Sequence, residues 1–168
     1  MRTFTRSIVP IVLFFACLGA SAQQKGSIDL GYMHNGHSKL NGVNLSYYHH
    51  LNEHWSIGVE GIRFFPAKKI KTGEETELSA WDFEFNLHYN IKLSHEWKFY
   101  PIAGIGHTSE KEIVGGVPNK DKIWSFNTGA GIGYEKGHWA PHVEYSLSWG
   151  EFNQQFYLVG ISYELDWK

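Results

Sequence analysis

Apolar and polar residues alternate with a period of two along most of the chain after residue 25. The clearest case is residues 77–91, where Phe83 and Phe85 alternate with Asp82 and Glu84. This alternation predicts β-strands with one apolar and one polar face, and the three-four spacing of an amphipathic helix is absent. We predict eight strands, at residues 26–33, 42–50, 55–65, 77–91, 97–107, 123–135, 139–149 and 155–167.

Three tryptophans, Trp55, Trp97 and Trp139, stand 42 residues apart, and each begins a strand after a short polar turn. One such turn recurs for every two strands, which predicts a series of antiparallel hairpins with short turns at one end. The connections at the other end are predicted as loops, at residues 35–41, 66–76, 108–122 and 150–154.

The apolar face is rich in aromatic residues, and two arrangements could accommodate it. In a soluble barrel or sandwich this face would form the core, whereas in an outer-membrane barrel it would meet lipid and the polar face would fill the lumen. Glycine and serine on the polar face suit a narrow lumen, and Trp and Tyr at strand ends suit a membrane interface. We therefore predict an all-β fold, an eight-stranded antiparallel up-and-down transmembrane β-barrel.

This arrangement assigns side chains to the two faces. The interface girdles are predicted as Trp55, Tyr89, Trp97, Tyr134, Trp139 and Trp167 at one rim and Tyr32, Trp81, Trp124 and Trp149 at the other. The polar lumen is predicted to hold Asp29, Glu60, Asp82, Glu84, His88, Lys98, His142, Glu144 and Glu164. Because unpaired buried carboxylates are costly, we expect these acids to be hydrogen-bonded or linked through water.

The first residues indicate export. Arg2 and Arg6 precede an apolar stretch that ends at Ala20-Ser21-Ala22, so residues 1–22 are predicted to be a cleaved signal peptide and residues 23–168 the barrel domain. The single cysteine, Cys17, lies in the predicted signal peptide, where a lipoprotein signal is the weaker alternative. Without residues 1–22 the chain has 13 basic residues (15 − 2) and 17 acidic ones, a charge of −4 that gives no support for nucleic-acid binding.

Three stretches resemble the small eight-stranded outer-membrane barrels of the OmpA/OmpX type. They are Pro101–Gly106, Thr128–Tyr134 with the following hairpin to Ser146, and Gly160–Leu165 near the end of the chain. The last is similar to the terminal signal that barrel-assembly machinery recognises, although Lys168 follows the final Trp167. The resemblance implies an outer-membrane location and assembly by that machinery.

Candidates for chemistry are few. His107 and Ser109 resemble the His-x-Ser motif of lipid A deacylases, in which a histidine base activates a serine, with Asp121 or Glu112 as a possible orienting carboxylate. His49, His50 and His54 could suggest a metal site, but solvated rim histidines are the simpler interpretation. We predict no catalytic residue, no metal and no cofactor.

The predicted function is that of a non-enzymatic barrel, structural or surface-binding through its extracellular loops. A lipid A deacylase and a soluble lipocalin-like binding barrel are the alternatives. Partners are predicted to be outer-membrane lipids, including lipopolysaccharide, and the protein is expected to be a monomer. Four cations could contact lipid phosphates at the outer rim: Arg63, Lys68, Lys69 and Lys71.

Overall fold

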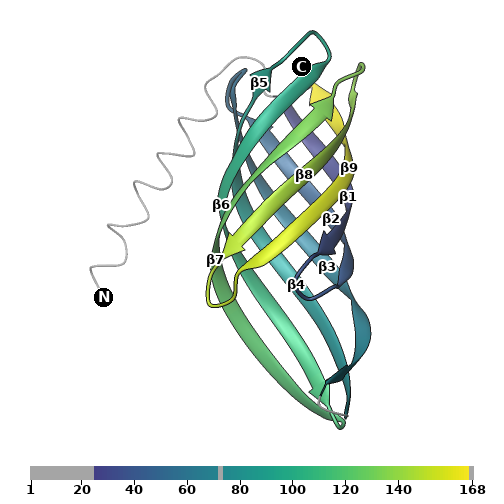
Figure 1. Cartoon of the computed structure of the whole chain (residues 1–168). Helices are drawn as coiled ribbons and strands as arrows, with labels where there is room; N and C mark the ends of the chain where they lie inside the picture. The colour runs from purple at the N-terminus through teal and green to yellow at the C-terminus, as the bar shows by residue number, and fades with distance from the viewer. Residues whose placement is uncertain (1–24, 72–73, 167–168) are drawn as a thin grey trace, which may run out of the picture.

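A computed structural model describes residues 25–71 and 74–166 of the chain and shows one antiparallel β-barrel (Figure 1). The strands are β1 (Lys25–Asn35), β2 (Asn41–His50), β3 (Trp55–Lys71), β4 (Glu74–Tyr89), β5 (Ile91–Lys92), β6 (Trp97–Val114), β7 (Val117–Tyr134), β8 (Trp139–Trp149) and β9 (Gln154–Asp166). No helix in this part of the chain has the length and apolar character needed to cross a membrane. The predicted signal peptide and Trp167 lie outside the described residues.

Eight long strands close the barrel, and β5 only extends the pairing of β6 by two residues. Each long strand pairs antiparallel with its neighbours in the chain, and β4 pairs directly with β6. The first and last strands complete the closure, because β1 pairs with β9 from Lys25↔Asp166 to Asn35↔Phe156. The predicted fold class and all eight predicted strands are therefore confirmed.

The eight strands differ in length. With 11 residues at roughly 3.4 Å each and a tilt of about 40°, β1 rises about the 25 Å of an outer-membrane apolar band. β6 and β7 each have 18 residues, so they rise roughly 18 Å further. In Figure 1 the hairpins β3–β4 and β6–β7 continue far beyond the hairpins β1–β2 and β8–β9, at the end of the barrel opposite the C-terminus.

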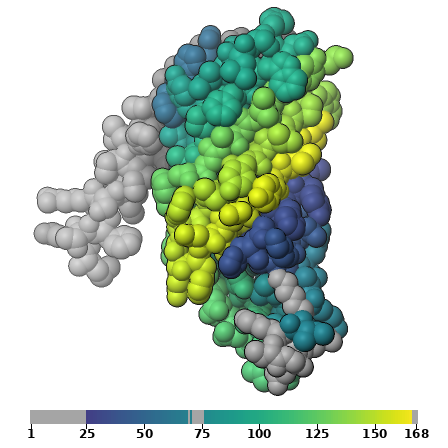
Figure 2. All heavy atoms as spheres, viewed as in Figure 1, coloured from purple at the N-terminus to yellow at the C-terminus, as the bar shows by residue number. Residues whose placement is uncertain are grey.

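We call this extension the projecting sheet, made of residues 65–71 of β3, 74–80 of β4, 109–114 of β6 and 117–123 of β7. Its existence corrects the predicted loops at 66–76 and 108–122, which are mostly paired strand. In this pairing Lys68 lies opposite Glu77. Figure 2 shows that the short hairpins end well before this tip of the molecule.

Two local signals explain the longer strands. Gly115 and Gly116 have φ values of 56° and 86°, the left-handed pair that a two-residue hairpin turn needs. Pro66 lies in the irregular register between Phe64 and Ala67, where a residue that cannot donate a ladder hydrogen bond is tolerated. The β3–β4 and β6–β7 hairpins therefore continue past the predicted strand ends.

Over most of the barrel wall the apolar residues point outward. Leu30, Leu45 and Phe83 are 58%, 60% and 61% exposed, whereas their strand neighbours Asp29 and Asp82 are buried. This excludes the soluble alternative, in which the aromatic face would form the core. The apolar wall instead has the polarity of a surface solvated by lipid.

The polarity reverses toward the projecting sheet. On β3, Ile62 and Phe64 point inward and are fully buried, while Arg63 lies on the outer face. Together with residues from the ends of the short hairpins they form an apolar cluster inside the barrel: Met33, Leu40, Ile62, Phe64, Ala80, Phe156 and Leu158, with Ala67 and Leu78 packed against it. This end of the barrel has an apolar core, as a water-soluble barrel would.

Candidate functional site

Glu60 of β3 is the centre of a hydrogen-bond network at mid-height in the lumen. Tyr48 donates its hydroxyl to Glu60, and the side-chain amides of Asn44 and Asn86 donate to the same carboxylate at 2.8 and 2.6 Å. Asn86 also donates to Glu84 at 2.9 Å. Three neighbouring strands, β2, β3 and β4, supply these groups, so the network fixes their side chains relative to one another.

A second group of polar residues lies on the wall formed by β1, β8 and β9. Ser162 donates to Asp29 at 2.7 Å, and His142 Nε2 lies 3.2 Å from Asp29 and 3.8 Å from Glu144. The hydroxyl of Tyr100, from β6, donates to Glu144 at 2.8 Å. Asp29 and Glu144 therefore each have a polar partner through one oxygen, while Asp29 Oδ1 is buried without a hydrogen bond among the described residues.

Aromatic rings join these two groups across the lumen. The ring centroid of His88 lies 4.3 Å from that of Tyr48 and 5.0 Å from that of Tyr100. Each of these tyrosines has a glycine beside it in cross-strand register, Gly58 for Tyr48 and Gly131 for Tyr100, and a Cβ atom on either glycine would overlap the ring. The glycines thus provide the space that lets bulky side chains fill the lumen.

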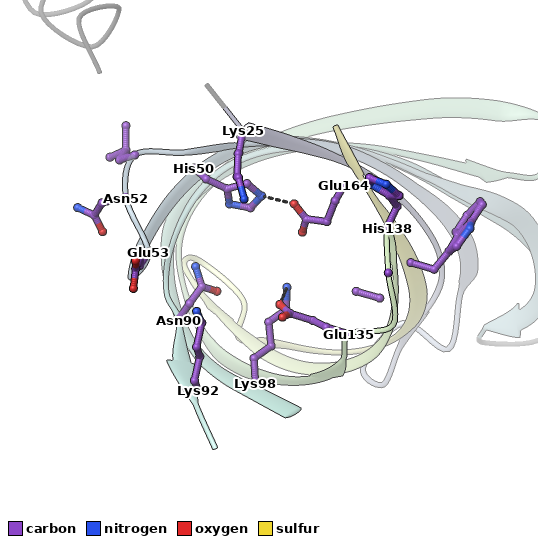
Figure 3. Close-up of a pocket in the computed structure, with 14 residues that line it drawn as sticks. Lys25, His50, Asn52, Glu53, Asn90, Lys92, Lys98, Glu135, His138 and Glu164 are labelled. Atoms are coloured by element: carbon purple, nitrogen blue, oxygen red, sulfur yellow. Dashed lines mark hydrogen bonds and ion pairs between the residues drawn. The ribbon is translucent and has the colours of Figure 1, made fainter. Parts of the chain in front are cut away.

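The lumen opens at the end that carries the short turns, in a pocket of about 660 Å³ (Figure 3). His50 is hydrogen-bonded to Glu164 in it, and Lys98 forms an ion pair with Glu135, each at 3.1 Å. Its other charged residues include both signs, so the pocket has no strong preference for an anion or a cation. The polar network lies deeper in the lumen, and the apolar cluster lies beyond it. No continuous water path is therefore expected through the barrel.

The structure places all nine predicted lumen residues on the inner face. Buried are Asp29, Glu60, Asp82, His88 and His142, and half-buried are Glu84, Lys98, Glu144 and Glu164. Tyr100 was not among the predicted lumen residues. Strand alternation could have placed it there, because Tyr100 follows the outward position of Phe99 by one residue.

The predicted girdle residues in the described part of the chain lie on the outer face, Tyr134 half-buried and the other eight exposed. At the turn end the repeated tryptophans each pair with a tyrosine across the strands: Trp55 with Tyr89 at 4.7 Å, Trp97 with Tyr134 at 5.1 Å and Trp139 with Tyr163 at 4.8 Å between ring centroids. Tyr163 was not among the predicted girdle residues. Its contact with a membrane interface, like that of the others, stays a prediction.

The predicted phosphate-binding cations are more scattered. Arg63 lies on the outer face, with its guanidinium 4.7 Å from the ring centroid of Trp81. Lys68 is exposed further along β3. The side chains of Lys69 and Lys71 lie outside the described part of the structure.

The possible hydrolase residues do not form a triad. His107 and Ser109 are two residues apart on the outer face of β6, and His107 packs against Trp124 at 4.9 Å. The two suggested orienting carboxylates are on the opposite face, since Asp121 pairs with Glu110 and Glu112 is in phase with Glu110. No orienting carboxylate therefore reaches His107 from either position.

A metal site is likewise not assembled. In residues 25–71 and 74–166 no group of three His, Cys, Asp or Glu side chains has an arrangement that could hold a metal ion. His50 is engaged with Ser56 and Glu164, at 2.7 and 3.1 Å, rather than with its histidine neighbours.

Residues 11–164 match the family model described as outer membrane protein beta-barrel domain. This chain belongs to that family. A comparison with curated protein sequences found no match. The family places the barrel in the outer membrane, where its outward apolar residues meet lipid.

Solved barrels have the same fold at low sequence identity. Ail, the attachment invasion locus protein of Yersinia pestis, is 16% identical with a TM-score of 0.63, over 86% of this chain and 100% of that one. The N-terminal barrel domain of Pseudomonas aeruginosa OprF is 14% identical with a TM-score of 0.64, over 86% and 100% of the two chains. Neisserial surface protein A is 10% identical with a TM-score of 0.60, over 86% and 96%. At these identities the similarity concerns the fold alone.

Proposed function

We propose that the protein is a non-enzymatic outer-membrane barrel that binds a partner at the cell surface through its projecting sheet. The observation that carries the proposal is the combination of a filled lumen with a four-stranded extension of one side of the wall. A filled lumen provides no passage, so the extension is the part of the barrel available for a task outside the membrane. The short turns would then lie in the periplasm.

The edges of the projecting sheet provide a means of binding. β2 pairs with β3 only up to Gly42↔Phe64, and β8 pairs with β7 only up to Phe126↔Trp149. Within the described residues, the outer edges of residues 65–71 and 117–125 therefore have no strand partner. Such an edge presents backbone donors and acceptors to which an extended segment of another protein can add as a strand.

The name of the Yersinia pestis relative, attachment invasion locus protein, supports a surface role by similarity of fold. That protein has also been solved in complex with the heparin analogue sucrose octasulfate. Both facts concern the relative, and they suggest which probes to include in a binding assay.

The binding test compares the full-length protein in lipid nanodiscs with a variant whose residues 69–76 and 112–119 are each replaced by Asn-Gly, which keeps Lys68 opposite Glu77 and Lys111 opposite Lys120. Both are applied to an array of extracellular matrix proteins and sulfated glycans. We expect the wild type to bind at least one array member and the shortened barrel to lose that binding. S94N/H95G, a change in a turn at the other end, is the control and should bind as the wild type does. Equal binding by the shortened barrel, or no binding by the wild type, would contradict the proposal.

The orientation can be tested on intact cells with a membrane-impermeant amine reagent. We expect Lys120 and Lys122 to be labelled and Lys92 and Lys136 to be protected until the outer membrane is permeabilised. All four lysines are exposed in the structure, so a difference in labelling reports on the side of the membrane. The reverse pattern would place the projecting sheet in the periplasm.

We also infer that residues 1–22 direct export and that barrel-assembly machinery recognises the terminal strand. The support is the composition of residues 1–22 and the alternation in Gly160–Leu165. N-terminal sequencing of the mature protein should begin near Gln23.

A further inference from the structure

Three lysines gather on the outer face of the β6–β7 hairpin, in the projecting sheet. Lys111, Lys120 and Lys122 are all exposed. Lys111 lies directly opposite Lys120, and Lys122 lies opposite Ser109. Among the described residues, no ion pair joins any of the three ammonium groups to a carboxylate.

The strand registers show that no acid lies in the rows of the outer face that hold these lysines. One row across β3, β4, β6 and β7 is Arg63, Trp81, Ser109 and Lys122, and the next row outward contains Ser79, Lys111 and Lys120. The first acid, Glu77, appears one row further out, opposite Lys68. Opposed Cβ atoms are about 5 Å apart, and alternate residues of one strand about 7 Å. The three lysines therefore form one compact cationic patch.

This clustering has a cost that no ion pair among the described residues offsets. Like charges directly opposite in a sheet destabilise it, and Lys111 and Lys120 are such a pair. The adjacent cross-strand pair of this hairpin is Glu110 and Asp121, whose side chains lie on the inner face of the sheet. The hairpin thus separates its charges, with bases on the outer face and acids on the inner face. An external anion would relieve the repulsion among the lysines.

The position of the patch indicates which anion is available. The row nearer the membrane than Lys122 contains Phe83, His107 and Trp124, and Trp124 is 70% exposed. The patch is thus continuous with the lipid-facing wall and begins where that wall ends. Tryptophan is favoured at the level of the lipid head groups, so the lysines lie at the depth of lipid phosphates.

We propose that Lys111, Lys120 and Lys122, with Arg63 at the margin of the patch, bind the phosphate groups of a phosphorylated outer-leaflet lipid. Of the two predicted cations whose side chains the structure describes, Arg63 belongs to this site and Lys68 does not. Lys68 lies a row further out, opposite an acid. The proposal rests on the outer-membrane location and on the outward direction of the projecting sheet, but not on what its edges bind.

The test uses the full-length protein in mixed micelles with lipid A that carries both phosphates, and native mass spectrometry measures the bound lipid. We expect K111Q/K120Q/K122Q to lower the affinity by on the order of a hundredfold at low salt, because each of the three lysines near a lipid head group contributes about 1 kcal/mol. The control K39Q/K92Q/K136Q makes the same charge change at three exposed lysines elsewhere and should stay within about twofold of the wild type. Heat-shifted mobility on SDS gels verifies that each variant is folded.

Removing the phosphates from lipid A should reduce wild-type binding at least to the level of the triple variant and should affect the triple variant far less, because only Arg63 of the patch remains in it. Equal losses in the triple variant and the control would overturn the proposal. So would wild-type binding that is the same with and without lipid phosphates. A triple variant that loses sucrose octasulfate but retains lipid A would assign the patch to a soluble polyanion instead. None of these outcomes depends on the array assay of the projecting sheet edges.

Discussion

The barrel wall contains two sections of opposite polarity. In the membrane section Leu30 and Phe85 point outward and Asp29 and Glu60 inward, whereas near the projecting sheet Arg63 and Lys111 point outward and Ile62 inward. β4, β6 and β7 pass through both sections with their mutual register unchanged. The difference fits lipid outside the membrane section and water outside the projecting sheet, and on β3 and β7 the outward residues become cationic at Arg63 and Lys122.

The largest effect is expected in the apolar cluster, which resembles the core of a soluble protein. Phe64 is 1% exposed and packs against Phe156 at 6.0 Å between ring centroids. Phe64→Ala should lower the free energy of unfolding by about 3 to 5 kcal/mol, the range for a buried Phe. Urea unfolding in lipid bilayers measures it. Phe83→Ala, on the lipid-facing wall, should lower the free energy of unfolding clearly less. Equal losses in the two variants would argue that the two sections do not differ in how their apolar residues are buried.

The next largest effect on stability tests where the lipid-facing section of the wall ends. Leu30 is at the centre of the outward face of β1, so Leu30→Lys should cost about 2 to 4 kcal/mol, as for a cation near the bilayer midplane. Ile70 is 83% exposed in the projecting sheet, and Ile70→Lys should cost close to nothing because the site faces water. The same unfolding measurement applies. A large loss of stability in Ile70→Lys would mean that the projecting sheet also faces lipid.

A smaller loss of stability is expected when a larger side chain is placed in the polar lumen. Gly131→Val places a branched side chain against the ring of Tyr100 and should cost about 1 to 3 kcal/mol, as overpacking does. The double variant with Tyr100→Ala should recover part of this stability. Gly61→Val is the control, because the nearest atom to its Cβ, on Phe83, is 3.8 Å away. A similar loss in the control would point to backbone effects rather than to the filled lumen.

No effect on lipid A hydrolysis is expected from substituting Ser109 on the outer face of β6. Ser109→Ala should leave any release of acyl chains from lipid A unchanged, since no carboxylate from the suggested positions orients His107. Mass spectrometry of lipid A from expressing cells measures it. Acyl release by the wild type that disappears in Ser109→Ala would establish the hydrolase alternative.

The membrane section could be predicted from the sequence, but the projecting sheet could not. Alternation of apolar and polar residues revealed strands such as 77–91 because one face met lipid and the other did not. In residues 108–122 both faces carry charges, so alternation has no contrast there, and Gly115-Gly116 was the only local signal of a hairpin. The lysine patch was missed for the same reason, since its members are brought together by the register of two strands.

The pairing of β1 with β9 has a consequence for how the barrel forms. The two strands lie at opposite ends of the chain, so the last seam cannot close until the final strand has been made and delivered. An open sheet in lipid would leave the backbone groups along two edges without partners, at several kcal/mol for each group. Loss of the last strand should therefore not yield a weakened barrel but prevent insertion, so that cells would contain either the complete molecule or a substrate for periplasmic proteases.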